Sequence, residues 1–243
     1  ARDRMAPMLR FFRHGDGVLA LFQGGQEGNP RMIANLLSRD EVRGQPFGHA
    51  RHSGYQRLAA GRSQILLDCG RVPQGAFANG SHAGFLALEM SSGAHRLVVN
   101  CGAGGKNQRG WDGVLRVTAA HSTLALADKS SAQILPPGLA RDLLGPRLTG
   151  GPHMPLTRRS ETALGWTAEA SHDAYVPELG LRHERKVTMS PQGQMVTGAD
   201  RIMPVTTRPF MPAQIQPMMA DATAWGDTVQ RVAKTEHKVM GLF

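Results

Sequence analysis

Three polar residues, His82, Asn100 and His121, lie at the edges of apolar runs and together could bind a metal ion. His82 opens the stretch HAGFLALEMSSG, Asn100 lies near the end of the following stretch AHRLVVNCG, and His121 opens HSTLALAD. Imidazole nitrogens are common protein ligands of zinc, and an amide oxygen can add a further ligand. The pattern indicates a candidate zinc site, and hydrogen-bonded histidines at a sheet edge are the alternative.

A β-hairpin is the element expected to position two of these residues. Residues 82–93 and 94–102 are both apolar runs, and the turn formers Ser-Ser-Gly at 91–93 lie where the first run ends. Such a turn places His82 and Asn100 at the same open end of the hairpin, because the two strands run antiparallel. His121 begins another predicted strand, which we expect beside this hairpin.

Short apolar runs separated by turn formers recur along the chain, which contains 29 Gly and 15 Pro among 243 residues. Turn signals at intervals of about 8–12 residues predict an all-β fold, an antiparallel β-sandwich. The predicted strands cover residues 18–25, 55–61, 62–70, 82–93, 94–102, 121–128, 158–165, 166–175, 181–190 and 193–203, and a loop is expected over about 135–155.

The beginning of the chain has a different pattern. Residues 1–13 carry apolar side chains at helical spacing, and a short helix is also expected within 31–40. We interpret residues 1–16 as the end of a helical domain whose earlier part is absent, and residues 17–243 as one β-sandwich domain. The last segment alternates less regularly, although 227–234 and 237–243 still favour extended structure.

The chain is basic, with 28 Lys and Arg against 19 Asp and Glu, a formal net charge of +9. This charge favours a polyanionic partner. The basic residues are scattered, and aromatic residues make up only 5% of the chain, so nucleic acid is not the expected partner. No apolar stretch is long enough to span a membrane. The two cysteines, Cys69 and Cys101, form no Cys-x-x-Cys pattern, which excludes a zinc ribbon.

Five stretches in order carry a family resemblance: FFRHGDGVLALFQGG, GYQRLAAGRSQILLDCG, SHAGFLALEMSSGAHRLVVNCG, TAAHSTLALAD and LRHERKVTMS. Together they resemble the C-terminal half of heparinase II/III-family proteins, and more narrowly their uncharacterised bacterial members. The resemblance implies an N-terminal α/α toroid followed by an antiparallel β-sandwich. It also implies a polysaccharide lyase that cleaves uronic-acid-containing chains by β-elimination, with Tyr or His as general base and acid. A periplasmic or exported location follows from the same resemblance.

The resemblance assigns a structural zinc to His82, Asn100 and His121, and it also exposes departures from the family pattern. Gly80 stands where the family has a catalytic histidine, and Gly84 where its motif has an aspartate. Asn100 replaces a metal-binding aspartate, and a neutral amide is a poorer partner for Zn²⁺. No catalytic residue is therefore identified in this chain. Two interpretations stay open: a lyase domain with a degenerate site, inactive alone, or a non-catalytic glycan-binding or scaffolding module.

Other polar residues supply further candidates. His172, Tyr175 and Trp111 are candidates for contacts with sugar, and a strand end or an end-plug of the sandwich is the alternative. The adjacent residues Ser171, His172 and Asp173 cannot form a catalytic relay, because neighbours in a strand point to opposite faces. Arg185 is expected to pair with a buried acid such as Asp200.

Overall fold

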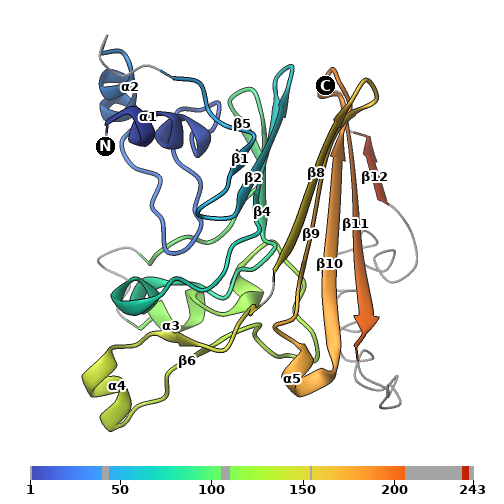
Figure 1. Cartoon of the computed structure of the whole chain (residues 1–243). Coiled ribbons are helices and arrows are strands. Elements are labelled where there is room, and N and C mark those ends of the chain that lie inside the picture. Colours follow the sequence, from blue (N-terminus) through green and yellow to red (C-terminus); the bar gives the residue numbers. More distant parts are fainter. Residues whose placement is uncertain (1, 40–43, 105–109, 154, 206–236, 241–243) are drawn as a thin grey trace.

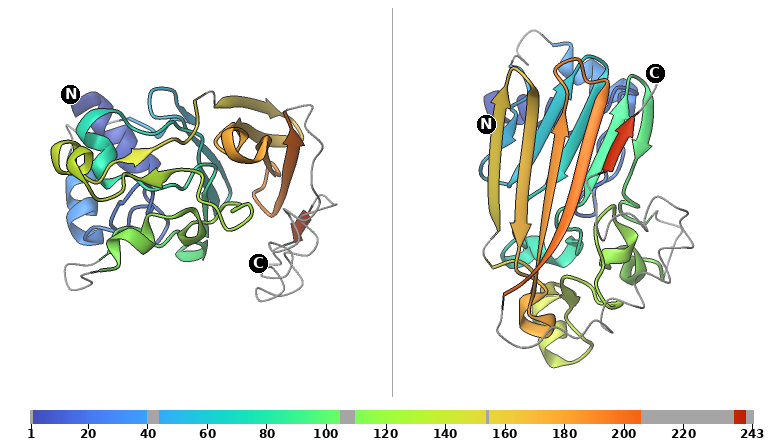
Figure 2. Two further views of the ribbon diagram at one scale, coloured as in Figure 1. Left: turned by 90° about the horizontal axis from the view of Figure 1, so that it is seen from below. Right: turned by 90° about the vertical axis from the view of Figure 1, so that its right-hand side faces the viewer.

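Two antiparallel sheets of five strands dominate the structure, a computed structural model that describes residues 2–39, 44–104, 110–153, 155–205 and 237–240. The first sheet has the order β1-β2-β3-β4-β5 and the second the order β12-β11-β10-β9-β8 (Figure 1). The two sheets face each other, as the two further views also show (Figure 2). The predicted antiparallel β-sandwich is confirmed.

The strands are β1 (His49–Ala50), β2 (Tyr55–Ala60), β3 (Ser63–Asp68), β4 (Leu88–Ser92), β5 (His95–Val98), β6 (Gln133–Ile134), β7 (Leu148–Thr149), β8 (Leu156–Thr162), β9 (Gly165–His172), β10 (Leu181–Met189), β11 (Met195–Pro204) and β12 (His237–Met240). The helices are α1 (Arg2–Phe11), α2 (Pro30–Leu37), α3 (Asp112–Leu115), α4 (Leu139–Leu144) and α5 (Val176–Leu179), with the 3-10 helices η1 (Gly75–Gly80) and η2 (Thr118–Ala120). No helix among the described residues has the length and apolar character that crossing a membrane requires.

Strand β3 is the common wall of two hydrophobic cores, and all six of its residues are buried. Ile65 and Leu67 belong to the core between the two sheets, together with Val187 and Met189 of the second sheet. Leu66 points the other way and joins the core that contains Phe11 of α1. Helices α1 and α2 lie on this outer side of the first sheet (Figure 1). Coverage on both faces explains why the apolar residues of β3, Ile65, Leu66 and Leu67, are consecutive instead of alternating with polar ones.

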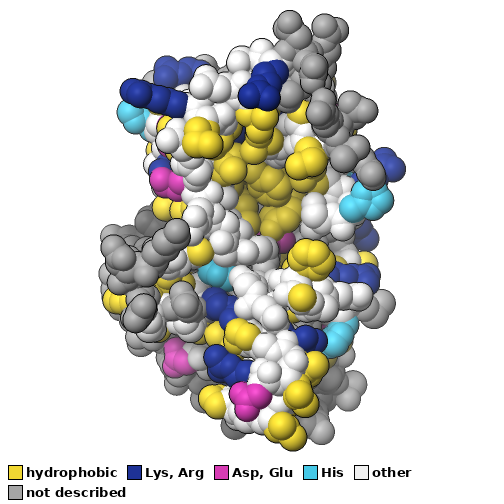
Figure 3. All heavy atoms as spheres, turned by 90° about the vertical axis from the view of Figure 1, so that its left-hand side faces the viewer, with side chains coloured by type: hydrophobic (Ala, Val, Ile, Leu, Met, Phe, Trp, Pro, Cys, Tyr) yellow, Lys and Arg dark blue, Asp and Glu magenta, His cyan; other side chains and the backbone are white. Residues whose placement is uncertain are grey.

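The face that carries α1 and α2 has an apolar hollow. Hydrophobic side chains gather in the upper half of this face, and a few Lys or Arg side chains lie around them (Figure 3). Large apolar side chains of this N-terminal region are exposed, with 68% of Met5 and 70% of Met32 accessible. Exposed apolar surface of this extent is typical of a surface that contacts another protein or domain.

Arg185 of β10 ties the second sheet to loops that extend from the first. Its Nε and Nη2 atoms donate to the carboxylate of Asp200 at 2.8 and 2.9 Å, which confirms the predicted pair. Its Nη1 atom donates to the backbone oxygens of Leu86 and Ser122, both at 2.7 Å. One buried guanidinium therefore holds two chain segments and a carboxylate at the centre of the sandwich.

A directional chain of hydrogen bonds runs from the backbone through two histidines to the same carboxylate. The Ala174 N–H donates to Nδ1 of His172 at 3.3 Å, so Nδ1 is the acceptor and Nε2 carries the proton. His172 Nε2 then donates to Nδ1 of His183 at 3.4 Å, and His183 Nε2 donates to Asp200 at 2.7 Å. Burial lowers the pKa of both imidazoles, which keeps the two rings neutral.

Three predicted strands are absent or shorter in the structure because of their backbone conformation. Residues 18–25 contain only an isolated bridge, formed by Leu19, and 121–128 only one formed by Leu126. The predicted strand over 82–93 begins only at Leu88. Non-glycine residues with φ of 50–59° lie in each of these three segments, and such angles are incompatible with an extended strand. These residues are Gln23, Leu86, Ala127 and Asp128.

Other predictions have mixed outcomes. The helices expected at 1–13 and within 31–40 are confirmed as α1 and α2, whereas the expected loop over 135–155 contains α4 and β7. The extended segment predicted over 227–234 lies outside the described residues, and 237–243 contains β12. The boundary at residue 16 stays a prediction.

We predict that Arg185→Leu lowers the free energy of unfolding by about 3–5 kcal/mol, because the Asp200 carboxylate loses its cationic partner and the carbonyl oxygens of Leu86 and Ser122 lose a charged donor. Arg201→Leu is the matched control on β11, since its side chain is 67% exposed and pairs with Glu184 at 3.6 Å. The control should change stability by less than about 1 kcal/mol. Urea denaturation measures both variants, and equal effects would contradict the proposed role of Arg185.

Candidate functional site

His82 and His121 form a buried pair of imidazoles. Their ring centroids are 5.2 Å apart, and only 3% of His82 and 9% of His121 is exposed. Nδ1 of His82 and Nε2 of His121 are buried and have no hydrogen-bond partner among the described residues. Buried polar atoms without partners are uncommon in folded proteins and indicate an additional ligand, such as an ion or a water molecule. The structure therefore brings together two of the three residues predicted as metal ligands.

The two histidines come from loops, not from the strands predicted by the sequence. His82 follows η1, and its backbone N–H donates to Oε1 of Gln23 at 3.0 Å. The Nε2 atom of Gln23 donates to Asp68 at 2.8 Å, so a buried carboxylate at the end of β3 fixes the loop through one side chain. Asp68 also accepts from the Gly70 N–H at 3.0 Å, which is the turn closure considered as one of its roles. His121 directly follows η2.

Arg116 holds the loop around His82 in place. Its guanidinium donates to the backbone oxygen of Ser81 at 2.8 Å and to that of Pro146 at 2.7 Å. Its own carbonyl oxygen accepts the N–H of Ala83 at 2.9 Å. The residues on both sides of His82 are thus bound to the same arginine, which limits the positions that the imidazole can take.

Close packing explains the glycine at position 84. A Cβ atom on Gly84 would lie 3.0 Å from Cγ of His121, closer than a side chain can approach without a shift of the ring. Gly80 differs, because a Cβ atom there would meet nothing within 4 Å. The position that the resemblance aligns with a catalytic histidine is therefore open, and this chain has no side chain there.

Asn100 is buried, but its amide is already used by the protein. Its Oδ1 atom accepts the Ser122 N–H at 2.9 Å, and its Nδ2 atom donates to Glu89 at 3.2 Å. Glu89 also accepts the backbone N–H groups of Leu21 at 2.9 Å and Asn100 at 3.1 Å, and its other oxygen lies 2.8 Å from Nε2 of His14. Asn100 is therefore a structural link between Glu89 and the segment that carries His121.

Burial determines the protonation state of the histidine pair. The pKa of His82 is lowered to about 4, first because burial disfavours the charged ring and then because His121 and Arg116 lie nearby. Burial also lowers the pKa of His121 to about 4, although the backbone of Leu115 and the charge of Glu89 oppose this shift. Both rings are neutral at pH 7, the form that can bind a metal ion.

The residues fit zinc in part. The two orphaned imidazole nitrogens are suitable ligands, whereas the oxygen of Asn100 is committed to a backbone N–H. Among the described residues, no group of three or more His, Cys, Asp or Glu side chains is placed to hold a metal ion. Structural zinc sites have four protein ligands, so this pair supplies half of such a set.

The predicted sugar-binding residues lie in two different environments. His172 and Tyr175 are each only 2% exposed, and the Tyr175 hydroxyl donates to the Leu124 carbonyl at 2.9 Å. The groove-facing position expected for these two residues is therefore not observed, because both pack inside the domain. Trp111 is 56% exposed at the start of α3, and its contact with sugar stays a prediction.

Sequence reasoning missed four residues that build the site: His14, Gln23, Glu89 and Arg116. Glu89 gave a detectable signal, since it is a lone carboxylate within the apolar run FLALEM. A charged residue in such a run is either at a surface or fully paired, and here it is fully buried and paired. The other three gave no signal, because their contacts join segments that are distant in the sequence.

Comparison with known proteins gives one family and one curated relative. Residues 42–224 match the sequence model of the family described as Heparinase II/III-like, C-terminal. The FtsZ-localized protein C of Caulobacter vibrioides (strain NA1000 / CB15N) is 31% identical over 213 residues. That alignment covers 86% of this chain and 36% of the relative, so the chain spans about a third of the relative's length.

Solved structures share the fold at low sequence identity. The heparan sulfate lyase HepC from Pedobacter heparinus has 12% identity and a TM-score of 0.53, over 80% of this chain and 31% of that chain. A structure of heparinase III has 11% identity and a TM-score of 0.58, over 82% of this chain and 33% of that chain.

We predict that the histidine pair makes the folded protein less stable in mild acid. The pKa of each ring is about 4 in the folded state and 6.5 when exposed, so its stabilising contribution is complete above pH 6.5 and declines as the pH falls from 6.5 towards 4. The loss by pH 4 is roughly 3 kcal/mol for each ring. Urea denaturation in EDTA should give a flatter pH profile for His82→Gln than for the native chain. His52→Gln, at an exposed histidine, should leave the profile unchanged, and identical profiles for all three proteins would contradict the prediction.

Proposed function

Because the chain belongs to the heparinase II/III-like C-terminal family, we propose that it is the glycan-binding β-sandwich of a protein that acts on uronic-acid-containing anionic polysaccharides. Its own contribution is to bind the glycan and to form one side of the binding cleft. Proton transfer belongs to a separate N-terminal α/α toroid. The net charge of +9 and the folds shared with heparinase III and a heparan sulfate lyase support this proposal.

The observation that carries the proposal is the state of His82 and His121. β-Elimination requires a base that reaches the C5 proton of a uronate and has a pKa near the working pH. Both imidazoles are buried, and a pKa of about 4 makes them weak bases at neutral pH. Gly80 offers no side chain at its open position. The described part of the chain therefore supports binding better than catalysis.

The toroid is the proposed occupant of the apolar hollow in Figure 3. The exposed methionines of α1 and α2 would be buried by a domain that packs on this side. In this arrangement the anionic substrate is held between the toroid and the β-sandwich, and Trp111 is the exposed aromatic residue proposed to stack on a sugar ring. The envelope of a bacterium, either the periplasm or the outside, is the proposed location.

The relative from Caulobacter favours a second candidate function. That protein is named for its localisation with FtsZ, and its similarity to this chain is much greater than that of the lyase structures. A shared role would make this domain a scaffold for other proteins, with neither glycan binding nor turnover. The absence of a catalytic side chain at position 80 is compatible with this candidate as well.

We predict that the chain binds zinc through the two histidines and not through Asn100. Elemental analysis after equilibration with zinc should show metal in the native chain that is lost in His82→Ala and in His121→Ala. Asn100→Ala should keep the metal but lower the free energy of unfolding by about 1–3 kcal/mol, since it leaves buried partners unsatisfied. His95→Ala, an exposed histidine on β5, is the control. A native chain without zinc would contradict the metal proposal.

We predict that the isolated chain binds a uronic-acid-containing oligosaccharide but does not cleave it. Isothermal titration calorimetry measures the binding, and absorbance of the unsaturated uronate product measures cleavage. A longer protein with the toroid should produce this absorbance if it is a lyase. Absence of binding by the isolated chain would overturn the glycan proposal and leave the scaffold as the better candidate.

A further inference from the structure

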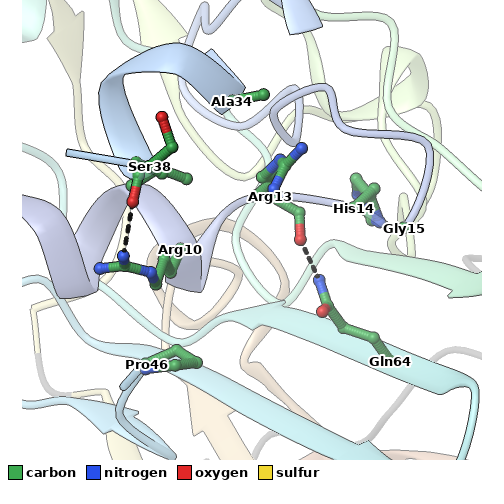
Figure 4. A pocket seen from close by; sticks show the side chains of 9 residues that line it. Arg10, Arg13, His14, Gly15, Ala34, Ser38, Pro46 and Gln64 are labelled. Atoms are coloured by element: carbon green, nitrogen blue, oxygen red, sulfur yellow. Dashed lines mark hydrogen bonds between the residues drawn. The ribbon is translucent and has the colours of Figure 1, made fainter. Parts of the chain in front are cut away.

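A cleft lies between α1, α2 and β3 (Figure 4). Its volume is about 490 Å³, which is within the range of about 300–1,000 Å³ that is usual for small-molecule sites. The residues used below are Arg10, Arg13, Leu37, Ser38, Pro46 and Gln64, which all line the cleft.

Two arginines line the cleft. Arg10 and Arg13 both contribute to it, and no Asp or Glu is found among the described residues that form it. The guanidinium of Arg10 is held at this wall by the backbone oxygens of Gly44 and Leu37, both at 3.1 Å. These bonds fix the position of the guanidinium at the wall of the cleft.

Arg13 is the residue that is available to a ligand. Its Nε atom donates to the Gly17 carbonyl at 3.3 Å, and its backbone oxygen accepts from Gln64 at 3.1 Å. The first contact restrains the guanidinium, and the second restrains the backbone of Arg13. Among the described residues, neither Nη atom of Arg13 has an acceptor, so the outer edge of the guanidinium can bind a planar or tetrahedral oxyanion with two hydrogen bonds.

The remaining lining suits a sugar. Ser38 contributes a hydroxyl group at the end of α2, while Leu37 and Pro46 contribute apolar surface. A charged group, a few polar groups and apolar contacts are the usual composition of a small-ligand site. We infer that this cleft binds the carboxylate or sulfate group of a sugar in an anionic glycan, with Arg13 as its main partner. This inference rests on the proposed function, since it names the place where the domain holds the glycan.

The test compares a uronic-acid-containing oligosaccharide with free sulfate as ligands of the full chain. By calorimetry, Arg13→Gln should weaken oligosaccharide binding by about tenfold or more, which is the usual effect of losing hydrogen bonds to a charged group. Arg158→Gln removes the same charge from a side chain that is 82% exposed on β8, and it should change the affinity by less than about threefold.

Ser38→Glu serves as a second variant, since it places a carboxylate at the cleft and leaves the contacts of Arg13 intact. It should weaken binding as Arg13→Gln does, with an unchanged melting temperature. Native affinity in both variants would overturn the inference that the glycan binds in this cleft, but it would leave the proposed function intact. A native chain that binds sulfate through Arg13 but no oligosaccharide would overturn the proposed function and the glycan assignment, and binding of neither ligand would overturn both proposals.

Discussion

The buried carboxylate of Glu89 is the interaction on which the arrangement of the domain depends. A carboxylate without exposure to water is very unfavourable unless donors surround it. Here four donors do so: two backbone N–H groups, the Asn100 amide and the imidazole of His14. These donors come from two segments, the one after α1, which contains His14 and Leu21, and the one after β5, which contains Asn100. Satisfying one charge therefore fixes both segments against strand β4.

Side chains that are hydrogen-bonded to buried carboxylates also position the histidine pair. Gln23 lies in the segment that Glu89 fixes, and it connects Asp68 to the backbone of His82. Asn100 connects Glu89 to Ser122, the residue after His121. The two imidazoles are thus held by neighbours of the buried carboxylates, although neither ring contacts a carboxylate directly. An arrangement fixed before a ligand arrives reduces the ordering cost of binding.

The sequence allowed the sheets to be predicted much better than the site. Alternating patterns identified β8 to β11 and the Arg185–Asp200 pair, because strand periodicity is a local property. The loop that carries His82 was read as a strand, since its apolar residues hide the positive φ angle of Leu86. His82 and His121 were still paired correctly, whereas Asn100 was predicted as a metal ligand, because no local pattern reports the contacts with Glu89 and Ser122 that commit its amide. Long-range polar contacts of this kind can be recognised only when the fold is known.

The position of β3 has a consequence for how the domain loses its structure. One strand closes two cores, so neither the helical layer nor the second sheet can separate without exposing apolar side chains of this strand. The two cores are therefore expected to melt together, in one cooperative transition. Amide hydrogens of β3 should exchange with solvent only through global unfolding, whereas those of the edge strands β5 and β8 can exchange through local opening.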